Sequence, residues 1–144
     1  MDISFPKHLT LENLNAFFIK DQLPESFGLA FTEIGKDFIK GSLTVDERHL
    51  RPGKIMNGGV SLVLIETLGS MSAACLVDTN KFNPLGIQVT ANHLAIARPG
   101  DVITATSKPV HIGRSTQIWD VSIRNQKDQL VCDGRITLLI AEKK

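Results

Sequence analysis

Long apolar runs, an excess of charge of one sign and cysteine are all scarce in this sequence. No apolar run approaches the roughly 18 residues that a membrane helix needs, so we expect no membrane partner. Sixteen basic residues are scattered among fifteen acidic ones, which excludes the basic stripe typical of nucleic-acid binders. The first residues lack the basic-then-apolar layout of a secretory signal. These absences predict a soluble, cytoplasmic protein.

Only two cysteines occur, Cys75 in a helix-like stretch and Cys132 in a strand-like stretch. Neither has a neighbouring cysteine or the histidine spacing of a zinc site, so we expect buried free thiols, no metal and no cofactor. The chain of 144 residues has the usual length of one domain. We therefore expect residues 1–144 to form a single domain.

The most apolar segment that is present runs from Asn57 to about Val77 and contains no proline. Its apolar residues fall on nearly all faces of a helix, and the segment is too short to span a bilayer. This combination predicts a core helix that other structure encloses. A shorter amphipathic helix is expected from Thr10 to Asp21, behind a threonine cap.

Strand-like alternation of apolar and polar residues occupies much of the remaining sequence. Two short strands joined by a turn are predicted between Gly28 and Val45, and a charged loop is predicted from Asp46 to Lys54. Four longer strands, joined by hairpin-like breaks, are predicted over residues 85–97, 102–112, 116–124 and 130–141. We expect an α+β fold in which an antiparallel meander wraps around the central helix.

Glu66 stands in the middle of the predicted core helix, between Ile65 and Thr67. Burial of a carboxylate is costly unless the group is paired, hydrogen-bonded or protonated. Two interpretations stay open on periodicity alone. Glu66 is either a functional acid or a structural acid that meets a lysine, an arginine or a backbone group across an interface.

Two glycines, Gly58 and Gly59, stand at the start of the same helix. Their free N–H groups at the positive end of the helix dipole can receive a carbonyl oxygen or an anion, although such a pair more often makes a turn. Gly58 and Glu66 are about 12 Å apart along a helix that rises about 1.5 Å per residue. Two protomers packed antiparallel would therefore bring the two residues to one carbonyl group more easily than a single protomer.

The segment Asn57-Gly-Gly-Val-Ser-Leu-Val-Leu-Ile-Glu66-Thr-Leu-Gly-Ser70-Met resembles the His-Gly-Gly … Glu/Asp signature of hotdog-fold acyl-CoA thioesterases, especially the phenylacetate-pathway and enterobactin-proofreading groups. The likeness runs from about Leu43 to the C-terminus and includes the turn Val110-His-Ile-Gly-Arg114-Ser115. The resemblance implies a hotdog fold, an antiparallel sheet wrapped around a long central helix. It also implies hydrolysis of acyl-CoA or aryl-CoA thioesters to free acid and CoA by a homodimer or a homotetramer.

The resemblance assigns a role to each matching residue. Glu66 would be the nucleophile or general base, Gly58 of the opposite protomer would be the oxyanion donor, and Ser70 would help to position water. Asn57 occupies the place of the family's histidine, and its amide can still donate to a thioester carbonyl but cannot switch charge. The expected substrate contacts are Arg51, where relatives carry Gln or Asn, together with Gly59, His93 and Arg114.

Several alternatives remain open at this point. The chain is either a thioesterase or a hotdog protein that binds acyl-CoA or a partner without turnover, which the loss of histidine at Asn57 would suit. Asn57 argues against a dehydratase, because that activity expects an acid–histidine pair near the helix start. His93 is either a packed histidine at a strand end or a substrate contact. Arg114 is either part of a solvated hairpin or a contact to CoA phosphates.

Overall fold

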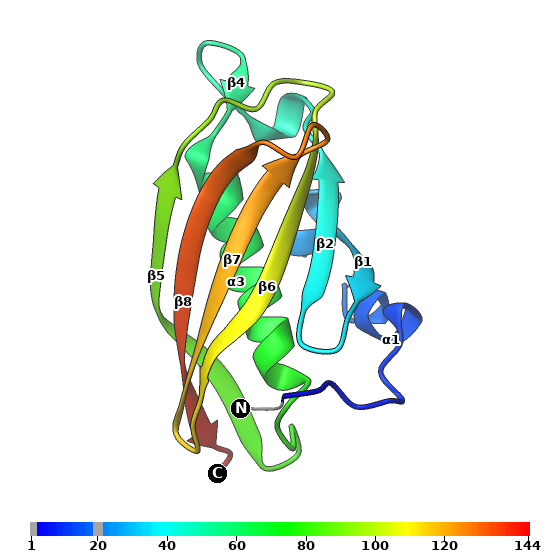
Figure 1. The fold of residues 1–144 in the computed structure, drawn as a ribbon, viewed down its shortest axis with the longest axis vertical. Coiled ribbons are helices and arrows are strands. Elements are labelled where there is room, and N and C mark those ends of the chain that lie inside the picture. Colours follow the sequence, from blue (N-terminus) through cyan, green and yellow to red (C-terminus); the bar gives the residue numbers. More distant parts are fainter. Residues whose placement is uncertain (1–2, 19–21) are drawn as a thin grey trace.

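The computed structural model describes residues 3–18 and 22–144. A six-stranded antiparallel sheet curves around one long helix, α3 (Gly58–Ala74), as Figure 1 shows. The strands are β1 (Ala30–Ile34), β2 (Ile39–Thr44), β5 (Phe82–His93), β6 (Val102–Ile112), β7 (Thr116–Asn125) and β8 (Leu130–Glu142). Their order across the sheet is β1-β2-β6-β7-β8-β5. The expected α+β plan, a sheet around a central helix, is confirmed.

The predicted meander after the helix is wrong in one respect. Strands β6, β7 and β8 are neighbours in the order expected, but β5 pairs with β8 at the far edge of the sheet and not with β6. The chain from residue 94 to residue 101 therefore crosses the end of the sheet, and β2 takes the place beside β6. A short Gly/Pro break looks the same in the sequence whether it makes a hairpin or a crossover.

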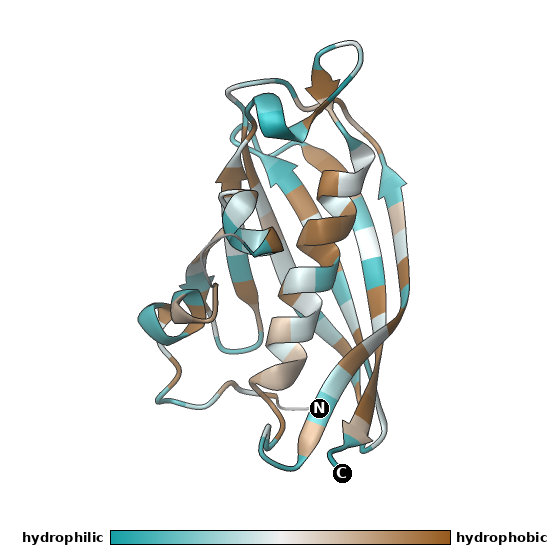
Figure 2. Cartoon of the chain, turned by 180° about the vertical axis from the view of Figure 1, so that it is seen from behind, coloured by the Kyte–Doolittle hydropathy of each residue, from teal (hydrophilic) through white to brown (hydrophobic). Residues whose placement is uncertain are grey.

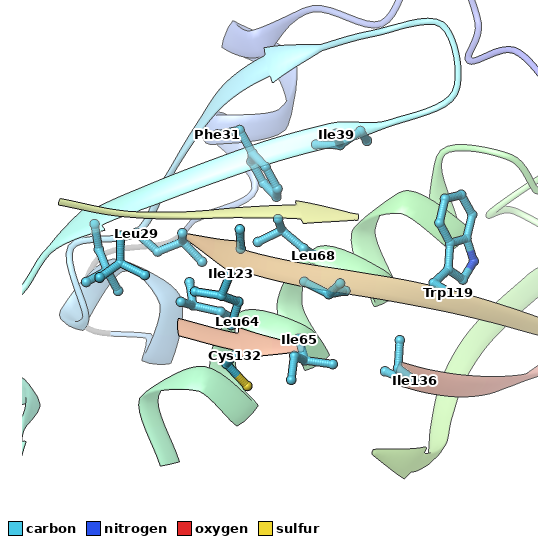
Figure 3. Close-up of a cluster of buried hydrophobic side chains, with 14 of the residues drawn as sticks. Leu29, Phe31, Ile39, Leu64, Ile65, Leu68, Trp119, Ile123, Cys132 and Ile136 are labelled. Atoms are coloured by element: carbon cyan, nitrogen blue, oxygen red, sulfur yellow. The ribbon is translucent and has the colours of Figure 1, made fainter. Parts of the chain in front are cut away.

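The core lies between α3 and the concave face of the sheet. Leu64, Ile65 and Leu68 of α3 are fully buried, and each such side chain contributes about 1.5 to 3 kcal/mol. The helix approaches the sheet closely at Gly69, where a Cβ atom would collide with the side chain of Ile136. The sheet residues of this core that Figure 3 labels are Phe31, Ile39, Trp119, Ile123, Cys132 and Ile136.

One face of α3 is open, so the predicted enclosure of this helix on all sides is wrong for a single protomer. Figure 2 shows α3 in front of the sheet with no further element across it. Leu62 is 41% exposed, and Glu66 is exposed beside it. Periodicity cannot distinguish a helix face that its own chain covers from a face that a second chain would cover.

The N-terminal region packs beside β1. The predicted helix is shorter than expected: α1 spans Leu11–Ala16, behind a Thr10 cap whose side chain accepts the N–H of Asn13. Residues 19–21 of the predicted helix lie outside the described residues. A second short helix, α2, spans Leu23–Ser26. Within the described ranges, no helix is both long and apolar enough to cross a membrane.

The predicted charged loop is an ordered hairpin that leads into α3. A short 3-10 helix, η1 (Glu47–His49), precedes β3 (Leu50–Arg51) and β4 (Ile55–Met56). Asp46 caps η1, and its hydrogen bonds with Arg48 lower the pKa of the Asp46 carboxyl to about 2. This hairpin lies at the top of Figure 1, next to the start of α3.

Candidate active site

The start of α3 is held in place by its neighbours in the chain. The Asn57 N–H donates to the carbonyl oxygen of His49 at 2.8 Å. His49 is buried, its Nδ1 accepts the Asp46 N–H at 2.9 Å, and its Nε2 lies 2.9 Å from the carbonyl oxygen of Phe27. These partners assign the neutral tautomer with the proton on Nε2. The buried His49 ring thereby ties the 3-10 helix, and through it the helix start, to the segment after α2.

The side chain of Asn57 serves as the cap of α3. Its Oδ1 accepts the Gly59 N–H at 2.8 Å, so the N–H of Gly59 is already hydrogen-bonded and is not available to a ligand. The N–H of Gly58 has no partner within the part of the chain that the structure describes. A free N–H at the first position of a helix is a ready donor to a carbonyl oxygen or an anion. The donor role predicted for the Asn57 amide itself stays a prediction.

A cavity of about 360 Å³ lies in front of this helix start. Its polar wall is formed by Arg51 of β3, Gly58 and Ser61 of α3, and His93 at the end of β5. The His93 ring covers Gly58 closely, because a Cβ atom at Gly58 would lie 2.9 Å from His93 Nε2. The structure therefore brings together three of the predicted site residues, Arg51, Gly58 and His93.

Glu66 lies in a separate groove of about 330 Å³ on the open face of α3. The other residues that line this groove are Leu23, Leu62, Val63, Thr67 and Val89. Ser70, one turn later, donates its hydroxyl hydrogen to Glu66 Oε1 at 3.1 Å. The carboxylate is exposed and has no lysine or arginine within ion-pair distance among the described residues. The expected burial of Glu66 is wrong for one protomer, because the face of α3 that carries it is open.

Gly86 of β5 lies against Glu66 and is not among the residues that the sequence predicts for the site. A Cβ atom at this position would lie 2.5 Å from Glu66 Oε1, so only glycine leaves the carboxylate in its present place. The pairing of β5 with β8 shifts register immediately after Gly86. The sequence could have indicated this residue, because a glycine inside an alternating strand pattern often marks a bulge or a close approach of another group to the backbone.

Arg114 is not brought together with the other predicted residues in one protomer. It belongs to the β6–β7 turn at the bottom of Figure 1, whereas Arg51, Gly58 and His93 lie at the opposite end of the sheet. The contact predicted between Arg114 and CoA phosphates stays a prediction.

Neither cysteine is poised to act as a nucleophile. Both are free, and burial raises the pKa of the Cys75 thiol to about 11 and also raises that of Cys132, which lies beside Ser61. The thiolate is the reactive form of cysteine, so a raised pKa removes reactivity at neutral pH. In residues 3–18 and 22–144, no group of three His, Cys, Asp or Glu side chains is arranged to hold a metal ion.

The chain is similar in sequence and fold to known esterases and thioesterases. Residues 53–132 match the model of the thioesterase superfamily. The chain is 35% identical over 134 residues to a putative esterase of Pasteurella multocida, covering 93% of this chain and 94% of that protein. It is 34% identical to the 1,4-dihydroxy-2-naphthoyl-CoA hydrolase of Escherichia coli, and the match covers 93% of this chain and 96% of that protein. The crystal structure of a mutant thioesterase from Pseudomonas aeruginosa matches with a TM-score of 0.91 at 32% identity, covering 96% of this chain and 99% of that one.

Proposed function

This chain belongs to the thioesterase superfamily, and on that premise we propose that it hydrolyses acyl-CoA thioesters to free acid and CoA at a site shared between two copies. The family and the hotdog fold expected from the Asn57–Met71 segment are confirmed by these similarities. In the proposed site, Glu66 comes from one copy and the Gly58 N–H from the other.

The observation that carries this proposal is the separation of Gly58 and Glu66 within one protomer. The two residues face different hollows and are about 12 Å apart along α3. A second copy that packs its α3 antiparallel against the open face would bring its Glu66 beside Gly58 of the first. Leu62 is midway in sequence between the two, so it would meet its own counterpart, and it is the exposed apolar residue of this face.

The edge strand β5 supports the same assembly. It borders the open face of α3, since Val89 of β5 lines the groove that contains Glu66. A long edge strand is a template on which another strand can pair. We therefore propose a homodimer in which a second copy covers β5 and the open face of α3 together, with further pairing of dimers allowed.

The chemistry needs a donor for the carbonyl oxygen and a carboxylate near the carbonyl carbon. The Gly58 N–H would donate to the thioester oxygen and stabilise the negative charge that develops there. Glu66 would either remove a proton from the attacking water or attack the carbon itself, giving an anhydride that water then opens. In both routes the C–S bond breaks and CoA leaves as a thiolate that takes up a proton.

Ser70 has a positioning role in this proposal. Its hydroxyl donates to one oxygen of Glu66, which leaves the other oxygen for water or for the carbonyl carbon. The resemblance predicts that this hydroxyl positions water, and the hydrogen bond to Glu66 supports a role on the carboxylate as well.

Substitution of Glu66 by glutamine tests this function. The Glu66→Gln variant keeps the size of the side chain but removes its charge, so turnover of an acyl-CoA panel should fall about a hundredfold or more. The melting temperature should change little, because the glutamine oxygen can still accept the Ser70 hydroxyl and the carboxylate has no ion-pair partner in the described chain. Glu12→Gln, an exposed change on α1, is the matched control and should keep full turnover.

Two outcomes would contradict the proposal. A folded Glu66→Gln protein with full activity would exclude the carboxylate from the reaction. A wild-type protein that binds acyl-CoA without releasing any thiol would favour the non-catalytic binder. Thiol release and melting temperature, measured on the same samples, separate these cases from simple misfolding.

A further inference from the structure

The cavity at the start of α3 contains polar groups that thioester hydrolysis does not need. The proposed reaction uses only the Gly58 N–H from this cavity. Arg51 and Ser61 line the same walls, and the proposed reaction assigns no step to either of them. Arg51 and Ser61 therefore suggest a polar group on the substrate that these two side chains would bind.

Arg51 is a cation without an anionic partner. Its Nη1 donates to the carbonyl oxygen of Pro52 at 2.9 Å, and no carboxylate of the described chain lies within ion-pair distance of its guanidinium. A guanidinium presents several donors in a planar fork that matches a carboxylate. Its place in the wall of a cavity therefore favours an anionic group inside that cavity.

Ser61 carries a buried hydroxyl without an oxygen or nitrogen partner. Its side chain is 0% exposed, and Oγ makes no hydrogen bond to an oxygen or nitrogen atom of the described residues. The Cys132 thiol lies beside it and can offer only a weak hydrogen bond, because sulfur is a poor donor and acceptor. A buried polar atom left unpaired destabilises the fold, and in native proteins such an atom calls for an explanation. Ser61 lines the cavity, so a bound ligand can supply the missing partner.

We propose that this cavity selects acyl groups that carry a carboxylate, with Arg51 pairing the charge and Ser61 donating a hydrogen bond. The inference rests on the proposed hydrolysis, because Gly58 would hold the thioester carbonyl at the same cavity. An anion bound in a cavity of about 360 Å³ together with that carbonyl must be only a few bonds away from it. The acyl group meets this condition, whereas the CoA phosphates are separated from sulfur by the whole pantetheine arm.

A matched pair of thioesters tests the selectivity. We would compare para- and meta-carboxybenzoyl-CoA with the corresponding methylbenzoyl-CoA, because a rigid ring keeps the carboxylate from attacking its own thioester. For at least one of the two ring positions, the wild type should hydrolyse carboxybenzoyl-CoA with a higher kcat/KM than methylbenzoyl-CoA. Arg51→Gln should lower the ratio of kcat/KM values for that pair about tenfold, and Arg51→Lys, which keeps the charge but loses the planar fork, should lower it less.

Two further variants control for structure. Lys54→Gln removes a positive charge from the same hairpin but outside the cavity, and it should leave the ratio unchanged. Ser61→Ala should lower the ratio while the melting temperature stays equal or rises, because the substitution removes an unpaired buried hydroxyl. A purely structural Ser61 would give the opposite result, a lower melting temperature with an unchanged ratio.

The same acyl groups on N-acetylcysteamine, which lacks the CoA phosphates, identify the source of the anion. If Arg51 pairs the acyl carboxylate, the wild type should also prefer the carboxybenzoyl over the methylbenzoyl thioester of N-acetylcysteamine. Arg51→Gln should lose this preference, as it does with the CoA thioesters. The proposal is overturned if Arg51→Gln weakens both CoA esters equally and leaves both N-acetylcysteamine esters unaffected, since Arg51 then binds phosphate. The proposal is also overturned if the wild type hydrolyses methylbenzoyl-CoA and carboxybenzoyl-CoA equally well at both ring positions. If the wild type hydrolyses none of the thioesters, the proposed function is refuted instead.

Discussion

The two edges of the sheet end in different ways. At one edge β1 has only five residues, and Asn15 of α1 pairs with it: Asn15 Nδ2 donates to the Phe31 carbonyl at 3.0 Å, and Asn15 Oδ1 accepts the Phe31 N–H at 2.8 Å. At the other edge β5 has twelve residues, and no strand of the described chain pairs with its outer side. On β5, Leu85 is 44% exposed and Ile87 is 62% exposed.

This difference distinguishes an edge that the chain covers itself from an edge that it leaves unpaired. A side-chain amide that offers one donor and one acceptor takes the place of a neighbouring strand at β1, so that edge is closed by its own chain. The open edge β5 is continuous with the open face of α3 and with Glu66. We therefore expect the second copy at β5, where the unpaired strand edge and the carboxylate lie together.

The largest effect should come from a charge placed on the open edge. Ile87→Lys puts a lysine in the bulged part of β5, and charged residues on edge strands oppose pairing. Light scattering at micromolar concentration should show the mass of one chain instead of at least two. Turnover should fall about a hundredfold or more, because a lone chain lacks the half of the site that the second copy supplies. Thr32→Lys makes a similar change in the bulge of β1 and should alter neither property. An Ile87→Lys protein that assembles normally would remove β5 from the interface.

A smaller effect is expected at the helix start, where stability and turnover should move in opposite directions. Asn57→Asp keeps the oxygen that accepts the Gly59 N–H and adds a charge that the helix dipole favours by about 0.3 to 1 kcal/mol. The same charge lies next to the Gly58 N–H, where the thioester oxygen becomes negative. We expect a slightly higher melting temperature and a turnover about tenfold lower. An Asp variant with unchanged turnover would place Asn57 away from the reacting carbonyl.

The smallest effect on function should come from the closed edge. Asn15→Ala removes both hydrogen bonds to Phe31 and leaves a strand edge unpaired, which should cost about 1 to 3 kcal/mol of stability. Thermal unfolding should show a melting temperature several degrees lower, with unchanged assembly and unchanged turnover per folded protein. Asn15→Asp keeps the acceptor and loses the donor, so its loss of stability should be intermediate. A change in oligomeric mass in either variant would show that the β1 edge also takes part in assembly.

Much of this architecture follows from local patterns in the sequence. The 3.6-residue period predicts α3 and puts Ser70 one turn after Glu66, where the structure has their hydrogen bond. Alternation predicts β6 at its observed bounds and β7 and β8 within one residue. The segment that carries the family resemblance contains Gly58 and Glu66, and the structure leaves both available at its surface.

The remainder depends on contacts between distant parts of the chain, which local patterns do not contain. The place of β5 beside β8 depends on which strands pair across the sheet. Whether the outer face of α3 is exposed depends on whether another element packs against it. Ser61 is an ordinary polar residue in the sequence, and only packing against β8 buries its hydroxyl with no polar neighbour other than the Cys132 thiol. Arg51 reaches the cavity because residues 50–56 form a hairpin too short for any period to predict.

Mixed dimers test the central claim, that Gly58 of one copy works with Glu66 of the other. Glu66→Gln and Gly58→Ala should each be nearly inactive alone, the latter because the new Cβ atom would press on the His93 ring at the oxyanion donor. After the two variants are unfolded together and refolded, half of the dimers should be mixed, and each mixed dimer should carry one intact site. We expect recovery of about one quarter of wild-type turnover. Turnover that stays at the level of the separate variants, in dimers proven to be mixed, would contradict a site shared between copies.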